Sequence, residues 1–349
     1  MSALARPPGW VGWLARRLAG AVAAILTLSA IVFAATQALP SDPARTVLGP
    51  DATEASIAEL RRQLGLDRPL FEQYLSWLGD LLGGDPGTSV DSRLPVGKLL
   101  GERLANSLAL LTCVLVTALA ATLLFGILAA VHRDRRLDRV ITSVAVTVQA
   151  VPAFVLAIAL VMVFATSVFH VLPAASLIEP GHSPWARPEY LVLPTIALAL
   201  SVTPYLLRQL RGALIEALDA DHVVAARLRG VPEHRLLLRH ALPGALVPLV
   251  QGVALTLSVL FGGSLVVEAA FTYPGIGSAL DAAVGVRDLP VVQACVLLIA
   301  TGVVTVNLLA DLLTVLLTPR LRTASGFGGR VAAAEPEPAP VVHPSEVAA

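Results

Sequence analysis

Residues 107–131 read SLALLTCVLVTALAATLLFGILAAV, a run of 25 residues without a charged side chain. A membrane-spanning helix needs about 20 mostly apolar residues to cross about 30 Å of hydrocarbon, so this run is long enough to span a bilayer. The sequence therefore predicts an all-α polytopic membrane protein with six transmembrane helices. The other five candidate spans are residues 18–39, 140–169, 190–207, 245–271 and 290–318.

Two of these spans are unusual. The 190–207 stretch is short and contains Pro194 and Pro204, so we expect it to be kinked. The 18–39 stretch follows Arg16 and Arg17 and could be read as a cleaved signal peptide. Its apolar part exceeds the 7–15 residues of a signal core, which favours a retained first helix.

The composition agrees with a membrane protein. Of 349 residues, 56% are hydrophobic and 14% are charged, whereas an ordinary soluble domain has about 25% charged residues. The net charge of zero excludes a strongly basic nucleic-acid-binding protein. Cys113 and Cys295 lie in apolar runs, and His170 and His182 are too sparse for a metal site, so we expect no disulfide framework, metal or cofactor in this chain.

The arginines set the predicted orientation. Under the positive-inside rule, short cytoplasmic loops carry an excess of Arg and Lys. The two short loops predicted to lie on the external side carry only Arg187 and Arg287. The chain is therefore predicted to lie in the plasma membrane with both termini on the cytoplasmic side. The arginines on that side are Arg6, Arg16, Arg17, Arg133, Arg135, Arg136, Arg139, Arg208, Arg211, Arg227, Arg229, Arg235, Arg239, Arg320, Arg322 and Arg330.

The segment 40–106 is too polar to span a membrane. Asp51 followed by Glu54 resembles a capping box for a first short helix. Asp67 and Pro69 then begin a second helix. We predict an external helical loop domain that either covers the membrane domain or helps to dock an external partner. The apolar faces predicted for the two helices are Ile57, Leu60 and Leu64, and Leu70, Phe71, Tyr74, Leu75, Leu78 and Leu82.

These patterns divide the chain. Residues 333–349 are rich in Ala, Pro and Glu and have almost no large apolar side chains, so they cannot bury enough surface to fold. The predicted order is a cytoplasmic N-terminus (1–17), a first helix (18–39), the external loop domain (40–106), a five-helix core (107–322) and a disordered cytoplasmic tail (323–349).

The cytoplasmic loop 208–244 carries a short helix with clear punctuation. Asp221 is placed to cap its N-terminus, and residues 222–229 make about two turns. Gly230 suits the left-handed position that closes a helix, and Pro232 stops propagation. A helix of two turns is marginal alone, so we expect it to be ordered by packing.

The side chains of this helix indicate a contact surface. Arg227 and Arg229 lie in the last turn, where the helix dipole favours cations. Ala225 and Ala226 are small, so another surface can approach closely.

The spacing in this loop resembles a family signature. Importer permeases of the ATP-binding-cassette class share a motif of Glu-Ala-Ala, three residues, Gly, nine residues and Ile-x-Leu-Pro. This chain has Ala225-Ala226, three residues, Gly230, nine residues and then His240-Ala241-Leu242-Pro243. Val224 replaces the glutamate and His240 the isoleucine, which leaves open the residue that makes a polar contact with a partner.

Other segments resemble the dipeptide and oligopeptide branch of that family. They follow the family order over residues 16–322. The segments are Pro40-Ser41-Asp42-Pro43; Leu64-Gly65-Leu66-Asp67-Arg68-Pro69-Leu70 with Gln73-Tyr74-Leu75; Val267-Glu268-Ala269-Ala270-Phe271 with Pro274-Gly275-Ile276-Gly277; and Asn307, Asp311 and Pro319-Arg320.

The resemblance implies a translocation subunit that is not itself an enzyme. It implies a second homologous permease, two ATPase subunits that bind ATP and Mg, an external substrate-binding protein, and import of di- or oligopeptides; nickel or another small solute remains an alternative. The phosphate loop that binds ATP has Ser or Thr directly after Gly-Lys. In this chain Lys98 follows Gly97, but the next residue is Leu99, so this sequence does not match that loop. The residues that the resemblance assigns to ATPase coupling are Asp221, Val224, Ala225, Ala226, Arg227, Gly230, Leu242 and Pro243.

Three polar residues in the last two spans are candidates for the pathway or for packing, namely Glu268, Asn307 and Asp311. Asp311 lies near the inner end of its span, which favours packing with a nearby Arg or backbone group over the proton relay of a secondary transporter. Glu268 and Asp288 flank the last external loop and are interpreted as solvated rim charges, with contact to a binding protein as the alternative.

The glycines beside Ser264 raise one further alternative. Gly262-Gly263-Ser264 could suggest an intramembrane serine protease, but no histidine follows in a later helix to activate the serine. We instead expect these two glycines to serve close helix packing or a flexible point.

Overall fold

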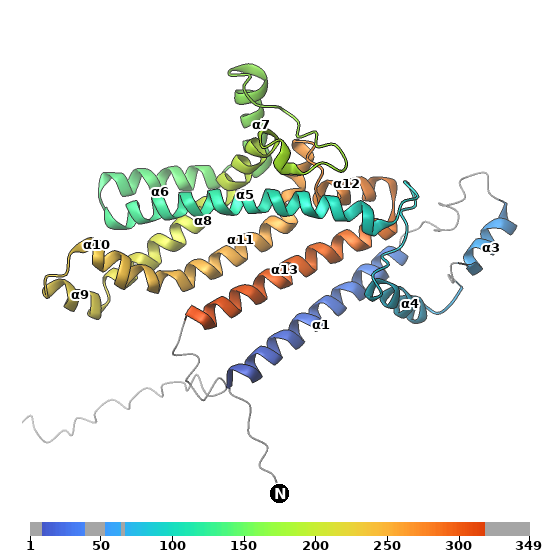
Figure 1. Ribbon diagram of the computed structural model, residues 1–349, viewed down its shortest axis with the longest axis horizontal. Coiled ribbons are helices and arrows are strands. Elements are labelled where there is room, and N and C mark those ends of the chain that lie inside the picture. The colour runs from blue at the N-terminus through green and yellow to red at the C-terminus, as the bar shows by residue number, and fades with distance from the viewer. Residues whose placement is uncertain (1–8, 39–52, 64–66, 318–349) are drawn as a thin grey trace, which may run out of the picture.

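The computed structural model describes residues 9–38, 53–63 and 67–317. Within them, five helices are long and apolar enough to cross a membrane, and a bent pair of helices makes a sixth candidate. The long helices lie side by side in one bundle (Figure 1). They are α1 (Gly9–Gln37), α5 (Val96–Val131), α8 (Glu189–Leu218), α11 (Leu242–Ala270) and α13 (Leu289–Leu317).

The bent pair departs most from the sequence expectation. Instead of one span at 140–169, α6 (Arg136–Gln149) is followed by α7 (Ala153–Val161), which passes into a π-helix, η1 (Met162–Ser167). The two halves are bent by 96°. Pro152 stands at the break, where it has no N–H to continue the helix. As a result α7 projects out of the bundle (Figure 1).

Shorter elements connect these helices. Apart from an isolated bridge between Thr88 and Pro95, the described residues contain no β-structure. The short elements are α3 (Glu54–Gln63), α4 (Leu70–Leu82), η2 (Pro184–Ala186), α9 (Asp221–Leu228), α10 (Glu233–Leu236), the π-helix η3 (Leu237–Ala241) and α12 (Ile276–Val286).

Helix α8 is the centre of the bundle. It packs against α5, α6, α7 and α11, and it continues through both Pro194 and Pro204. The predicted span 190–207 was too short because the apolar stripe of Leu206, Leu210 and Leu214 keeps one helix face buried as far as the loop.

Small residues bring the neighbouring helices close to α8. A Cβ on Gly126 of α5 would lie 3.1 Å from Leu210 Cδ2, and one on Gly252 of α11 would lie 3.4 Å from Leu206 Cδ2. Such contacts are how helices associate in a membrane. Gly262 and Gly263 do not pack closely against other helices of this chain, because a Cβ on either would meet nothing within 4 Å. The alternative of a flexible point stays a prediction.

Two boundaries of the predicted loops also change. Helix α5 begins after Pro95, well before residue 107. The added turns carry Lys98, Glu102 and Arg103, which ended the apolar run in the sequence but are compatible with a helix. The predicted loop 208–244 is mostly helix as well, since α8 reaches Leu218 and a continuous helical stretch runs from Glu233.

Helix α4 packs on α1 through aromatic residues. Tyr74 and Trp77 of α4 contact Phe33 of α1, with ring centroids 5.6 and 5.5 Å apart. The Tyr74 hydroxyl lies 2.8 Å from Ser29 Oγ. The apolar face predicted for α4 is wrong in part. Its members Leu70, Phe71, Leu75 and Leu82 are exposed.

Helix α3 forms as expected, with Thr53 at its start: the Ser56 N–H donates to Thr53 Oγ1 at 3.3 Å. Several predictions concern residues outside the described ranges. They include Asp51, the motifs at 40–43, 64–66 and 319–320, and the tail 323–349.

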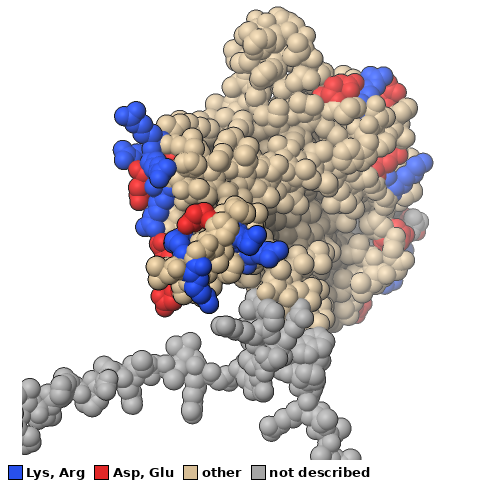
Figure 2. Space-filling model, turned by 60° about the vertical axis from the view of Figure 1, so that its left-hand side comes forward, with Lys and Arg blue, Asp and Glu red and all other residues tan. Residues whose placement is uncertain are grey.

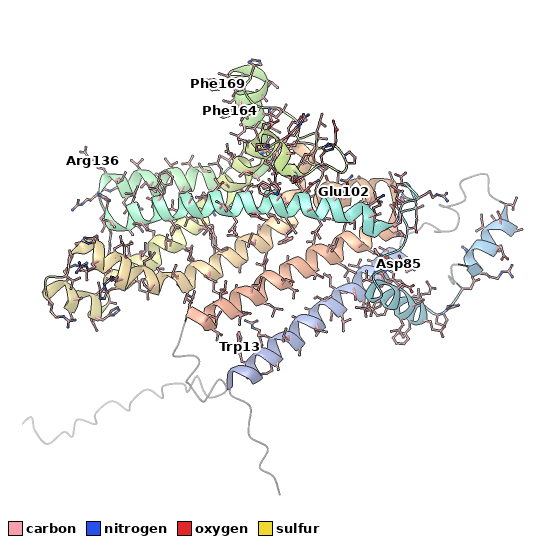
Figure 3. The ribbon with its side chains drawn as sticks, viewed as in Figure 1. Trp13, Asp85, Glu102, Arg136, Phe164 and Phe169 are labelled. Atoms are coloured by element: carbon pink, nitrogen blue, oxygen red, sulfur yellow. The ribbon has the colours of Figure 1, made fainter. Side chains whose placement is uncertain are left out.

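Charged side chains gather at two ends of the molecule. Figure 2 shows them on both sides of a wide surface without Lys, Arg, Asp or Glu. One end carries α9, α10 and the start of α6 with Arg136, and the other carries Asp85 and Glu102 (Figure 3). The uncharged surface between them is what a lipid bilayer requires.

Candidate functional site

Helix α9 connects α8 to α10 at the arginine-rich end of the bundle. It spans Asp221–Leu228 with Ala220 at the N-cap position and no side-chain cap. The prediction that Asp221 caps this helix is wrong, because the helix begins one residue earlier. Asp221 lies in the first turn instead, where its carboxylate complements the positive end of the helix dipole.

The C-terminus of α9 closes as the sequence predicted. Gly230 has a φ of +80°, the left-handed conformation. The Gly230 N–H donates to the Arg227 carbonyl at 2.9 Å, and the Val231 N–H donates to the Ala226 carbonyl at 3.2 Å. This pair of bonds is a Schellman motif, which satisfies the last carbonyls and fixes the exit direction of the chain.

One face of α9 packs on its own chain. Val223 and Ala226 are buried against Leu236 of α10, and Val231 packs on the same cluster. Ala226 is therefore used internally, contrary to the expectation that both alanines were free for an approaching surface.

The opposite face of α9 is open to solvent. Asp221, Val224 and Ala225 are exposed, and the Leu228 side chain is 84% exposed. These four residues follow the i, i+3, i+4, i+7 spacing of one helix face. Three of them are apolar, so α9 presents a small hydrophobic surface beside charged residues. We call these four residues the outer face of α9.

Ion pairs hold α9 in place. Arg227 Nε lies 2.7 Å from Glu233 Oε1 of α10, across the turn that contains Gly230. This hydrogen bond raises the pKa of the Arg227 guanidinium above its usual value. On the other side, Arg133 Nη1 after α5 lies 2.7 Å from Asp219 Oδ2 between α8 and α9. Because both pairs are exposed, they contribute orientation more than stability.

A buried ion pair anchors the same end. Arg211 of α8 binds Asp138 of α6 through two bonds of 2.7 Å, and the Asp138 side chain is only 4% exposed. Bidentate guanidinium–carboxylate contacts are strong and directional. The pair therefore ties α6 to the helix that leads into α9.

Leu242 and Pro243 begin α11 and do not lie in a loop. Pro243 occupies the first turn of α11, within the continuous helical stretch that begins at Glu233. The π-helix η3 precedes them, and Ala241 at its end is fully buried against Leu210 and Leu214 of α8. Helix α10 therefore continues through η3 into α11 without a loop.

At the opposite end, Glu268 is buried rather than a solvated rim charge. It is 1% exposed and accepts hydrogen bonds from Ser107 Oγ at 3.0 Å and the Ser278 N–H at 3.1 Å. Ser264 Oγ also donates to it, at 3.2 Å. The carboxylate thus caps the N-terminus of α12 from the neighbouring α11. The rim interpretation fails because the turn after Ala270 folds α12 back over α11.

Glycines make room for this carboxylate. A Cβ on Gly275 would lie 2.3 Å from Glu268 Oε2, and one on Gly277 would lie 2.6 Å from Leu265 Cα. A Cβ at Gly277 would collide with backbone, and a Cβ at Gly275 would push the Glu268 carboxylate and the Ser107 hydroxyl out of place. The rim interpretation of Asp288 is wrong as well, because Asp288 is 3% exposed and accepts hydrogen bonds from Ser89 Oγ and the Val90 N–H.

The two remaining polar candidates lie on α13. Asp311 Oδ2 is 3.0 Å from Arg17 Nε, and its other oxygen accepts from Arg17 Nη2 at 3.1 Å. Asn307 donates to Ser258 Oγ of α11 at 2.9 Å and to its own helix at the Val303 carbonyl. Both side chains therefore have partners that join helices. No cluster of three or more His, Cys, Asp or Glu able to hold a metal occurs among the described residues.

Comparison with known proteins decides the family. A model of the binding-protein-dependent transport system inner membrane component matches residues 122–323, and the model of the N-terminal part of such components matches residues 11–122.

The chain belongs to this permease family.

Curated relatives of the permease match it over nearly their whole length. The glutathione transport system permease protein GsiC of Salmonella choleraesuis strain SC-B67 is 36% identical over 312 residues, which are 89% of this chain and 99% of the relative. The protein of the same name from Escherichia coli strain K12 is 34% identical over the same coverage. The permease is thus a multi-pass inner-membrane subunit of an ATP-binding-cassette importer, and its relatives are transport subunits. The family implies a partner permease, ATPases and a binding protein.

Sequence reasoning missed several residues of this permease. Leu228 lies one turn after Val224 and continues the same face, a signal that the i, i+4 spacing carried. The partners Arg17 of Asp311 and Arg211 of Asp138 could not be found from spacing, because they come from distant helices.

Proposed function

We propose that this permease moves short peptides, of di- or oligopeptide size, across the plasma membrane. The relatives named for glutathione, which is a tripeptide, support this substrate class. Segments typical of the dipeptide and oligopeptide branch, such as Val267–Phe271 with Pro274–Gly277, support it independently of those names.

The outer face of α9 is the proposed docking surface for an ATPase subunit. The observation that carries this proposal is a short, rigidly closed helix whose exposed face is apolar, with Leu228 84% exposed. A buried apolar anchor inside a charged rim is the usual form of a protein contact. Arg229 and the Arg227–Glu233 pair would form that rim.

Coupling would then follow from how α9 is held. The helix has a fixed C-terminal exit at Gly230 and ion pairs on both sides, so it can move as one piece. Closure of the ATPases around ATP and Mg, which this chain would not bind itself, would shift α9 and the helices α8 and α11 attached to it. The bundle would switch between two states biased by the nucleotide.

This proposal sets the orientation. The α9 end and both termini would be cytoplasmic, in line with the arginines at that end. The segment between α1 and α5 would lie outside, together with α12, on the side where a binding protein delivers substrate.

Uptake by a strain that lacks this permease gene, with and without the gene restored, tests the function. We expect radiolabelled di- and tripeptides to enter only the restored strain, and vanadate enclosed with ATP in proteoliposomes of the reconstituted transporter to stop uptake because it traps the ATPases. Uptake that is insensitive to vanadate and collapses with the proton gradient would refute an ATP-driven importer. Vanadate-sensitive uptake of another solute with no peptide uptake would refute the peptide assignment alone.

A further inference from the structure

A cleft runs between α1 and α13, which lie side by side in Figure 1. This α1–α13 cleft holds about 750 Å³ of open space, and ligand sites in proteins commonly enclose about 300–1,000 Å³. A larger groove of about 950 Å³ lies between α5, α6 and α8, but none of the described residues that line it is charged. The α1–α13 cleft differs, because arginine and aspartate side chains form one end of its wall.

The wall of the α1–α13 cleft changes from charged to apolar along the two helices. Arg16, Arg17 and Asp311 line it near the start of α1 and the end of α13. Gly20 and Leu308 line it further toward the middle of the helices. A Cβ on Gly20 would meet nothing within 4 Å, so this part of the cleft is open. A phospholipid has the same order, with a charged headgroup followed by hydrocarbon.

The charged end of the cleft lies at the level expected for lipid headgroups. The apolar span of α1 runs over Gly12–Gln37, which is 26 residues, whereas about 20 residues cross the hydrocarbon. A centred span leaves about three residues at each end beyond the hydrocarbon, so Arg16 and Arg17 lie within about one turn of its edge. Trp13 stands at this end of α1 (Figure 3), with its ring centre 6.0 Å from Arg17 Cζ. Tryptophan is typical of the membrane–water interface.

Both arginines keep N–H donors available in the cleft. Asp311 holds Arg17 through Nε at 3.0 Å and Nη2 at 3.1 Å, which leaves Arg17 Nη1 without a partner among the described residues. Arg16 donates from Nε to the Gly12 carbonyl of its own helix at 3.3 Å. In the part of the chain that the structure describes, no carboxylate pairs with Arg16. Since every guanidinium nitrogen is a donor and none is an acceptor, these groups call for an acceptor from outside the chain.

The charges in this end of the cleft favour an anion. Two guanidinium groups face a single carboxylate, so one positive charge is left over. Such a charge is costly at the edge of the hydrocarbon unless it is paired, and a phosphate pairs with a guanidinium through parallel hydrogen bonds. The surface of α1 beside the cleft is apolar, since Leu18 and Val22 are 47% and 55% exposed. An anion that also carries hydrocarbon chains therefore suits both parts of the cleft.

We propose that the α1–α13 cleft binds an anionic phospholipid, with its phosphate on Arg16 and Arg17 and an acyl chain along Gly20 and Leu308. Basic pockets between membrane helices on the cytoplasmic side are typical sites for such headgroups. Asp311 then has a second role, because it orients Arg17 toward the headgroup as well as joining the helices. This inference uses the orientation proposed above and is independent of the substrate that the permease moves.

Photo-cross-linking from inside the cleft tests which molecule fills it. A diazirine amino acid of leucine size replaces Leu308 in the complete transporter, reconstituted in vesicles of phosphatidylglycerol and phosphatidylcholine in equal amounts. Mass spectrometry identifies the adduct. We expect phospholipid adducts in which phosphatidylglycerol exceeds phosphatidylcholine at least about fivefold, the effect of one arginine beside an anionic membrane surface. A cross-link to the partner permease or to another segment of this chain in place of phospholipid, or no preference between the two lipids, overturns the inference.

Variants of the charged end test the headgroup contact. Arg16→Ala leaves the pair of Arg17 with Asp311 intact, and it should reduce the preference for phosphatidylglycerol about fivefold. Arg16→Lys should keep most of the preference because it keeps the charge. The matched control is Arg136→Ala, since Arg136 is exposed at the arginine-rich end but does not line the cleft. Equal preferences in Arg16→Ala and Arg136→Ala contradict a headgroup site on Arg16.

Two further measurements test the acyl chain. Gly20→Phe fills the apolar part of the cleft and should reduce adducts with both lipids, whereas Ala19→Phe should not, because Ala19 is exposed outside the cleft. Equal adduct yields in the two phenylalanine variants overturn the placement of the chain. Glycerol 3-phosphate offers the phosphate without acyl chains and should not lower the yield of phosphatidylglycerol adduct. Competition by millimolar glycerol 3-phosphate would instead indicate a site for a soluble phosphate and overturn the lipid assignment.

Discussion

Replacing Gly230 by leucine perturbs one backbone position and nothing else. Gly230 has a φ of +80°, and a Cβ there would meet no atom within 4 Å. The whole effect is therefore conformational. A residue with a Cβ pays about 1–2 kcal/mol in the left-handed region.

This cost acts on the closed end of α9. If residue 230 leaves the left-handed region, the two bonds to the Arg227 and Ala226 carbonyls are lost together. A helix of two turns has little intrinsic stability to compensate. A penalty of 1–2 kcal/mol lowers the population of the closed helix by about five- to thirtyfold relative to open forms.

Peptide uptake per permease molecule in the membrane measures the effect. We expect Gly230→Leu to reduce uptake by at least about fivefold, with less ATPase co-purified through the affinity-tagged permease, while the amount of inserted permease stays unchanged. Gly230→Asn should retain more activity, because Asn tolerates the left-handed region better.

The matched control is Gly212→Leu on α8. Gly212 is also exposed with open space around its Cα, but it has ordinary helical backbone. Uptake by Gly212→Leu should equal that of the unaltered permease. If the two leucine variants transport equally well, the argument for a rigidly closed α9 is refuted.

Three further predictions concern other contacts. Leu228→Glu should reduce ATPase co-purification at least about tenfold without lowering the thermal stability of the permease, because an exposed anchor contributes to binding and not to folding. Normal co-purification would exclude this side chain from the interface. Glu268→Ala should lower the melting temperature of the purified permease, since loss of the carboxylate leaves the part-buried Ser278 N–H without its acceptor at a cost of about 1 kcal/mol or more. An unchanged melting temperature would show that the capping contact is dispensable. Arg17→Ala should destabilise the permease by no more than about 1 kcal/mol, because the Arg17 side chain is 54% exposed. Arg17→Asp or Asp311→Arg alone should reduce the amount of inserted permease, and the two changes together should restore it. Failure of the double exchange would argue against a simple ion pair.

The local features of α9 were readable from the chain. Gly230 and Pro232 specify a helix end because the left-handed backbone and the missing N–H are properties of single residues. The start was misassigned by one residue, with Ala220 in the cap position that Asp221 was expected to fill. Nothing in the sequence prevented the shift, since an acidic residue is equally favourable in the first turn.

Glu268 shows where local reading fails. Its position beside the last external loop suggested a solvated rim charge. Burial depends on Ser107 of α5 and Ser278 of α12, which approach it only after three helices have packed. The break at Pro152 is a similar case: the proline marks a weak point, whereas the packing of α7 against α8 and α11 decides how far the chain bends.

The sequence by itself determined that this is a helical membrane protein, which end carries the arginines, and where the short helix α9 closes. Each of these features depends on residues that are close together in the sequence. A bilayer favours helices because each spanning segment must make its backbone hydrogen bonds within itself. Only the tertiary structure decided the burial of Glu268, the pairing of Arg17 with Asp311, the outward turn of Leu228 and the groove between α5, α6 and α8. Each of these depends on which helices become neighbours, and that is set by the close packing of small residues between helices far apart in the chain.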